Sequence, residues 1–129
     1  MKFTIPVKPR TKKNHSSIVR LNNGKTLLLP SKQYREFEQE VIKYLNVHFK
    51  HDSKPISKRS NLKCIFYKDK NYRSDLMGYM QAIADVLVKA KILEDDNSNI
   101  VFSTDGSRVF LDKDNPRIEV EITEYEETE

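Results

Sequence analysis

The 129-residue sequence lacks the features of a disulfide-bonded, zinc-binding or membrane-spanning protein. It has one cysteine, Cys64, so no internal disulfide can form, and it has no apolar run long enough for a signal peptide or a membrane span. The histidines at 15, 48 and 51 have no zinc-site spacing with one another or with Cys64. We therefore expect a cytoplasmic protein with no membrane association, no zinc and no organic cofactor.

Acidic residues are scarce in the first part of the chain, and basic residues are scarce in the second. Residues 1–74 contain 18 Lys and Arg against 5 Asp and Glu, a net charge of +13. Residues 75–129 contain 5 Lys and Arg against 14 Asp and Glu, a net charge of −9. The basic part suggests a polyanionic partner, and the acidic part supplies carboxylates either for solubility or for a metal. A metal-dependent nuclease needs both, whereas a merely solvated surface usually mixes the two signs.

The composition favours one folded domain over residues 1–129, with 126–129 as a frayed tail. Hydrophobic residues make up 37% of the chain and charged residues 33%, so we expect one core beneath a heavily charged surface. The fold class we predict is α+β: a mixed sheet of about five or six strands that carries two main helices. The strands are expected at 2–7, 17–21, 26–30, 61–68, 100–104, 107–111 and 117–125, and the helices at 31–49 and 75–91.

Two of the predicted turns contain a glycine that tolerates the positive φ angles of tight hairpins. Asn23-Gly24 lies in a hairpin over residues 17–30, and Asp105-Gly106 joins the two short strands that follow residue 99. Cations flank the first of these turns. That hairpin is therefore either an arm that faces DNA or a segment that packs on the rest of the chain or on a second copy.

The segment 73–97 combines an apolar helix with acids at both of its ends. Asp75 is a natural N-cap, and the apolar residues that follow recur at steps of three and four. Beyond the helix we expect Ile92 and Leu93 to fold back and to carry three acids, residues 94–96, toward the side of the sheet that holds Asp75. Adjacent acids repel one another, and a hard divalent metal would compensate them. The alternative is a solvated acidic turn and an ordinary N-cap.

The same segment, RSDLMGYMQAIADVLVKAKILEDDN, resembles the signature of the RusA-type Holliday junction resolvases, small homodimeric endonucleases that are common in prophages. The family pattern has Arg-x-Asp-Leu, a helix with an internal Asp, and a turn that ends in Leu-x-Asp-Asp. The matching residues are Arg73, Asp75, Leu76, Asp85, Leu93, Asp95 and Asp96. Because IPVKPRTKKN and GKTLLLPSKQYREFEQEVIKYL also resemble the family's first loop, hairpin and first helix, the likeness spans about residues 1–124.

The resemblance implies a homodimeric, Mg²⁺-dependent endodeoxyribonuclease that nicks four-way junction DNA symmetrically in recombination and repair, leaving 5′-phosphates. It implies that Asp75 and Asp96 bind Mg²⁺, with Asp95 as a further catalytic residue, either as a ligand or beside one. Basic residues in the first loop and in the loop before Asp75 would hold phosphates. The DNA-binding residues we predict are Arg10, Lys12, Lys13, Asn14, Lys68, Lys70 and Arg73.

Three departures from the family pattern affect the predicted site. Met77 stands where the best-studied type has a second Mg²⁺-binding aspartate, Gly78 where Asn is usual, and Gln81 where a catalytic lysine is needed. They leave two alternatives open: a junction-binding or partner-binding protein on the same fold, and a metal nuclease for other branched DNA. We expect Asp85 to be structural and to pair with Lys89 at i,i+4.

Overall fold

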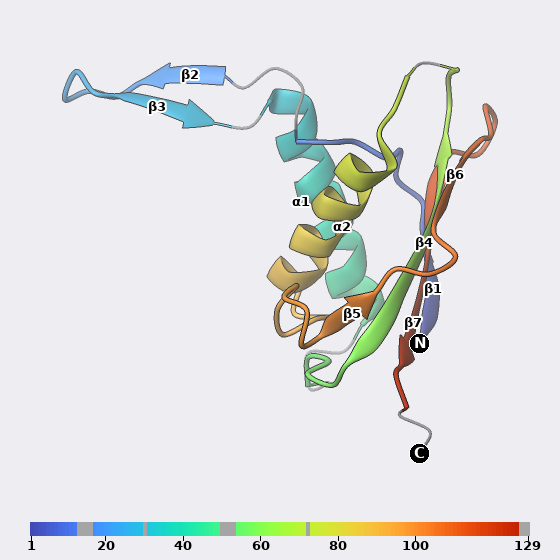
Figure 1. The fold of residues 1–129 in the computed structure, drawn as a ribbon. Coiled ribbons are helices and arrows are strands. Elements are labelled where there is room, and N and C mark those ends of the chain that lie inside the picture. Colours follow the sequence, from blue (N-terminus) through green and yellow to red (C-terminus); the bar gives the residue numbers. More distant parts are fainter. Residues whose placement is uncertain (13–16, 30, 50–53, 72, 127–129) are drawn as a thin grey trace.

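The computed structural model describes residues 1–12, 17–29, 31–49, 54–71 and 73–126 (Figure 1). Its main sheet has the order β1-β7-β4-β5, and β6 also pairs with β4. Both helices cover the same face of this sheet (Figure 1). The elements are β1 (Lys2–Ile5), β2 (Ser17–Arg20), β3 (Thr26–Leu29), α1 (Lys32–His48), β4 (Ser60–Lys68), α2 (Leu76–Lys89), β5 (Val101–Ser103), β6 (Arg108–Leu111) and β7 (Arg117–Glu124). The predicted α+β class, with a mixed sheet and two helices, is confirmed.

Strand β4 is the centre of the sheet, because β7 pairs with one of its edges and β5 and β6 with the other. Its alternate residues Leu62, Cys64 and Phe66 are buried under the helices. Apolar residues on both faces of this strand predict a place near the middle of a covered sheet, but in the described part of the chain no helix covers the second face (Figure 1). Ile65 and Tyr67 are only half-buried there. An Arg117 guanidinium 3.7 Å from the centroid of the Tyr67 ring shields part of that face.

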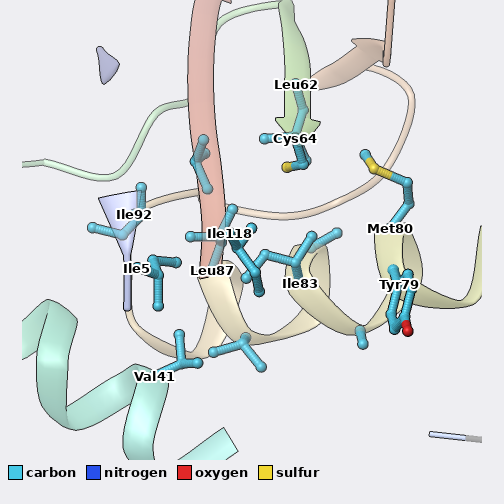
Figure 2. Close-up of a cluster of buried hydrophobic side chains, with 14 of the residues drawn as sticks. Ile5, Val41, Leu62, Cys64, Tyr79, Met80, Ile83, Leu87, Ile92 and Ile118 are labelled. Carbon is cyan, nitrogen blue, oxygen red and sulfur yellow. The ribbon is translucent and has the colours of Figure 1, made fainter. Parts of the chain in front are cut away.

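The two helices begin where the sequence predicts. Ser31 caps α1, its hydroxyl accepting from the Tyr34 N–H at 3.2 Å, and Asp75 caps α2, its carboxylate accepting from the Met77 N–H at 3.1 Å. Each helix buries the apolar stripe that its period predicts. Figure 2 shows the resulting core, in which side chains from both helices meet those of the sheet; those labelled are Ile5, Val41, Leu62, Cys64, Tyr79, Met80, Ile83, Leu87, Ile92 and Ile118.

The thiol of Cys64 is expected to react with a disulfide reagent only after the protein unfolds. The side chain is 0% exposed, and burial raises the pKa of its thiol to about 12, so that both access and the reactive thiolate are suppressed. Absorbance of the released aromatic thiolate at pH 8 measures the reaction, with urea-unfolded protein as the control. Stoichiometric labelling of the native protein within minutes would contradict this burial.

The predicted hairpin through Asp105-Gly106 is wrong. Strands β5 and β6 do not pair with each other, and both pair in parallel with β4. The Asn61 side chain provides the reason, because its Oδ1 accepts from the Ser103 hydroxyl at 2.6 Å and from the Asp105 N–H at 2.8 Å. Its amide also donates to the Asp105 carbonyl at 3.1 Å. The turn is therefore bonded to β4, and Gly106, at a φ of 87°, lets the chain continue along the same edge.

The predicted hairpin at residues 17–30 forms, and it stands apart from the main sheet. Strands β2 and β3 make a separate two-stranded antiparallel sheet, and Gly24 adopts a φ of 81° in the turn. The hairpin extends away from the helices and the main sheet (Figure 1). The backbone of the described hairpin therefore does not lie against the rest of its own chain (Figure 1). An arm toward DNA or toward a second copy remains as the interpretation.

Candidate functional site

Asp75 lies exposed at the start of α2, where the chain arrives from the end of β4. The connecting loop places three predicted DNA-binding cations at the same end of the helix. The Lys68 ammonium donates to the Ser74 hydroxyl at 3.2 Å, and Lys70 and Arg73 are exposed. Hydrolysis of a phosphodiester needs cations that attract the phosphate backbone of the nucleic acid. It also needs a carboxylate that assists the attack on the phosphate, and both kinds of group are found here.

The first loop of the chain crosses the first turn of α2 beside Asp75. A Cβ on Gly78 would lie 3.2 Å from Thr11 Cγ2 and 3.8 Å from Asp75 Cβ, so glycine permits this close approach. Arg10 extends toward α1, where it lines a small hollow together with Glu36. The predicted DNA-binding residues Lys13 and Asn14 lie outside the described residues.

Lys12, which is predicted to bind DNA, forms an ion pair and a cation–π contact within the chain. Its ammonium lies 2.7 Å from Asp85 Oδ2 and 5.5 Å from the centroid of the Tyr34 ring. The predicted pair between Asp85 and Lys89 is confirmed, at 3.4 Å, and Lys89 also donates to both carboxylate oxygens of Glu38 at 3.0 Å. Apart from this i,i+4 pair, nothing in the sequence signalled the cluster, because its other members come from distant segments.

The acidic cluster lies at the opposite end of α2 from Asp75. After the helix, Lys91 adopts a left-handed φ of 62°, and the N–H groups of Ile92 and Leu93 both donate to the Leu87 carbonyl. Leu93 then forms a parallel bridge with Ile56, which precedes β4. The turn therefore returns the chain to the start of β4, whereas Asp75 follows its end (Figure 1).

Within the cluster, Asp95 and Asp96 have different surroundings. The Asp95 carboxylate accepts from the Asp96 N–H at 2.8 Å and from the Asn97 amide at 3.0 Å. These bonds, that of the Asp96 N–H foremost, lower the pKa of Asp95. Both residues are exposed to solvent, but Asp95 also stabilises the turn through these two hydrogen bonds.

The prediction that this turn carries Asp96 to the side of Asp75 is wrong within a single chain. Helix α2 has 14 residues, so at 1.5 Å per residue a helix length of about 20 Å separates Asp75 from the turn that leads to Asp96. The cause is the parallel pairing of β5 with β4, since a parallel crossover must return to the beginning of the first strand. In the described part of the chain, no three His, Cys, Asp or Glu side chains lie together as a metal site requires. Among the described residues of one protomer, Asp75 and Asp96 are therefore not brought together.

A family model described as endodeoxyribonuclease RusA matches residues 6–123 of the sequence. The chain belongs to the RusA family. A search of curated proteins found no match. The family is one of endodeoxyribonucleases that resolve Holliday junctions.

The structure places the three departures from the RusA pattern on the first two turns of α2. Met77 is 68% exposed beside Asp75, and Gln81 is exposed one turn further along. Both therefore face outward from the protomer, as groups that contact a partner or DNA do. The glycine at position 78 is explained by packing, because a larger side chain there would press against Thr11.

The free energy of unfolding is expected to fall as the pH drops below about 4. Hydrogen bonds and nearby cations hold the pKa of four carboxyls below the ordinary 3.8: Asp69, Asp85, Asp95 and Asp112. For Asp85, burial alone would raise the pKa, but the Lys12 hydrogen bond and the charges of Lys12 and Lys89 lower it. A depressed folded pKa gives stability that is present above the unfolded pKa and is lost as the pH falls through the folded value.

Urea unfolding between pH 3 and pH 7 measures this dependence. The Asp85→Asn variant should lose less stability on acidification than the natural chain, because it lacks one of the depressed carboxyls. Asp114→Asn, at an exposed position in the β6–β7 loop, is the matched control and should follow the natural chain. A stability that stays level or rises from pH 5 to pH 3 would contradict the assignment.

In the part of the chain that the structure describes, neither helix combines the length and apolar character needed to cross a membrane.

Proposed function

We propose that this RusA-family chain is a Mg²⁺-dependent endodeoxyribonuclease that resolves four-way DNA junctions by paired symmetric nicks, leaving 5′-phosphates, and acts as a cytoplasmic homodimer in recombination and repair. The family match over residues 6–123 carries the proposal. The division of charge supports it, since the basic first part suits DNA and the acidic second part supplies carboxylates.

The separation of Asp75 from Asp96 supports an active site formed by two copies. If the α2 helices of two protomers run antiparallel about a two-fold axis, Asp75 of one protomer meets Asp96 of its partner. The same operation builds a second, identical site. A four-way junction has the same two-fold symmetry, so the two sites reach opposed strands.

The residues at each end of α2 have distinct roles in this proposal. Asp75 and the partner's Asp96 supply the exposed carboxylate oxygens that Mg²⁺ prefers. When bound, the ion would neutralise charge on the phosphate and make a bound water more acidic. Lys68, Lys70 and Arg73 hold the DNA backbone at the Asp75 end, and Asp95 positions Asp96 through the turn that it stabilises.

Cleavage of a synthetic four-way junction in Mg²⁺ tests this function. Denaturing gels should show symmetric nicks on two opposed strands, ligatable through their 5′-phosphates, and no such pairs on linear duplexes, flaps or forks. If the protein cuts another branched DNA in preference to the four-way junction, that DNA is its substrate instead.

The exposed Met77 and Gln81 favour one second candidate, a junction-binding protein without catalysis. These positions lack the family carboxylate and lysine, so the chain has fewer groups for the reaction. Gel shifts with and without Mg²⁺ separate the candidates. Tight junction binding with no nicking in Mg²⁺ or Mn²⁺ would establish the second and overturn the first.

A further inference from the structure

Two ion pairs tie the first loop of the chain across the segment that contains Asp75. At one side, the Lys8 ammonium lies 2.8 Å from Asp69 Oδ2, in the loop that leads into α2. At the other, the Lys12 ammonium lies 2.7 Å from Asp85 Oδ2, on α2 itself. Asp69 comes six residues before Asp75 and Asp85 ten residues after it, so the pairs bracket the carboxylate.

Between the two ion pairs the loop lies directly on the helix. Thr11 packs where Gly78 has no side chain, and the same space borders Asp75. Pro9 is buried, which fixes the backbone next to Arg10. The loop is thus held at three points, one in the loop before α2, one on its first turn and one on its third turn, although it forms no strand there.

We infer that Asp85, through Lys12, is a positioning residue that fixes the basic first loop over the Asp75 end of α2 for DNA binding. Asp69 has the same function through Lys8. The inference rests on the proposed function, and it assigns a role to the internal acid that the sequence indicated to be structural.

Energetics favour a positioning role over a purely stabilising one. The Lys12 and Asp85 side chains are 36% and 30% exposed, and pairs of this kind contribute little net stability because solvent screens them. A small free energy is nevertheless enough to select one conformation of a short loop. A displacement of the loop by about 1 Å would lower the cleavage rate on the order of a hundredfold, because phosphoryl transfer depends on the alignment of the reacting groups.

The contact also explains why a lysine in a DNA-binding loop is not itself free to bind phosphate. Lys12 lies over the Tyr34 ring, with Asp85 and Lys89 beside it. Releasing it would break the ion pair and expose the ring. Of the other loop cations among the described residues, Lys8 pairs with Asp69, and Arg10 lines the hollow beside Glu36.

The test compares Asp85→Asn and Lys12→Met with the double variant. Hydrogen exchange of residues 8–12 is measured in the free protein, junction affinity is measured in EDTA, and single-turnover cleavage is measured in Mg²⁺. Each single variant should accelerate exchange and weaken junction binding about tenfold, and the double variant should be no worse than either, because both act through one contact. Asp85→Glu, which keeps the charge, should retain most of the affinity.

Glu38→Gln is the matched control. It removes the α1 partner of Lys89 and leaves the Lys12–Asp85 pair in place, so exchange, affinity and cleavage should match the natural chain. Weaker binding by Lys12→Met but tighter binding by Asp85→Asn would overturn the inference and make Lys12 a phosphate ligand that Asp85 restrains. Faster exchange with unchanged affinity would reduce Asp85 to a structural role.

Failure of the proposed nuclease function can be distinguished from failure of the positioning role of Asp85. If the natural chain binds junctions without cutting them, the proposed nuclease function is wrong. The affinity and hydrogen-exchange comparisons would then still decide the role of Asp85. A natural chain with no junction affinity would overturn both.

Discussion

Mixing Asp75→Asn protein with Asp96→Asn protein is expected to restore junction nicking that neither variant has alone. Each substitution alone should lower the cleavage rate by about a thousandfold or more, because loss of a metal-binding carboxylate removes several kcal/mol of transition-state stabilisation. Junction binding should persist in both variants, since the basic loops are unchanged. Asp75 and the turn that leads to Asp96 lie at opposite ends of α2, a helix about 20 Å long, so we expect each site to combine residues of two protomers.

A mixed dimer has one site with both substitutions and one site with neither. If protomers exchange at random, half of the dimers are mixed, so about a quarter of all sites are intact. The restored activity should produce single nicks rather than paired ones, because a mixed dimer contains only one working site. Denaturing gels of a junction labelled on each strand in turn distinguish these products.

The control mixture combines Asp75→Asn with the double variant Asp75→Asn/Asp96→Asn. No dimer in that mixture has an intact composite site, so it should remain inactive. Refolding the proteins together ensures exchange of protomers, which light scattering and a tag on one variant verify. An inactive Asp75→Asn and Asp96→Asn mixture in which exchange is verified would place both carboxylates in sites within one protomer, against the separation across α2.

The elements that sequence reasoning placed correctly depend on local signals. Ser31 and Asp75 start the helices that they cap, because capping and the apolar period act within a few residues. Strand β4 was predicted from a continuous apolar run. Pro6 in the sequence predicts an edge position or an early end for the first strand, and β1 is an edge strand that ends at Ile5. Such signals need no knowledge of the distant chain.

The failures depend on contacts between distant segments. Asp105-Gly106 has the local pattern of a hairpin, but Asn61, more than forty residues earlier, bonds the turn to β4. The same holds for the site. The residues of the Asp75 and Asp96 segments were identified from the sequence, but their separation follows from the parallel pairing of β5, and the role of Lys12 from its contact with Asp85.

Leu87→Ala is expected to lower the free energy of unfolding by about 2 to 5 kcal/mol. The side chain is 0% exposed, in the core formed by both helices and the sheet (Figure 2). Alanine favours helix at least as well as leucine, so the loss comes from burial and from the cavity that remains. A domain of this size has about 5 to 15 kcal/mol in total, so the variant should unfold at a clearly lower urea concentration. Measurement at one fixed protein concentration keeps the mass-action contribution of dimerisation the same for both proteins.

Val47→Ala, on α1, is the matched control. Val47 is 73% exposed and lies outside α2, so its truncation should change the stability of the protomer by no more than about 0.5 kcal/mol. A loss below about 1 kcal/mol for Leu87→Ala would mean that the core collapses around the gap.

Junction cleavage by Leu87→Ala, measured well below the urea concentration of its unfolding midpoint, distinguishes a loss of stability from a loss of the active site. The substitution leaves the length of α2 unchanged, so Asp75 and the turn that leads to Asp96 stay one helix length apart and the cleavage rate should be retained. A rate that falls in Leu87→Ala while the protein remains folded would show that the active site depends on core packing as well as on the length of α2.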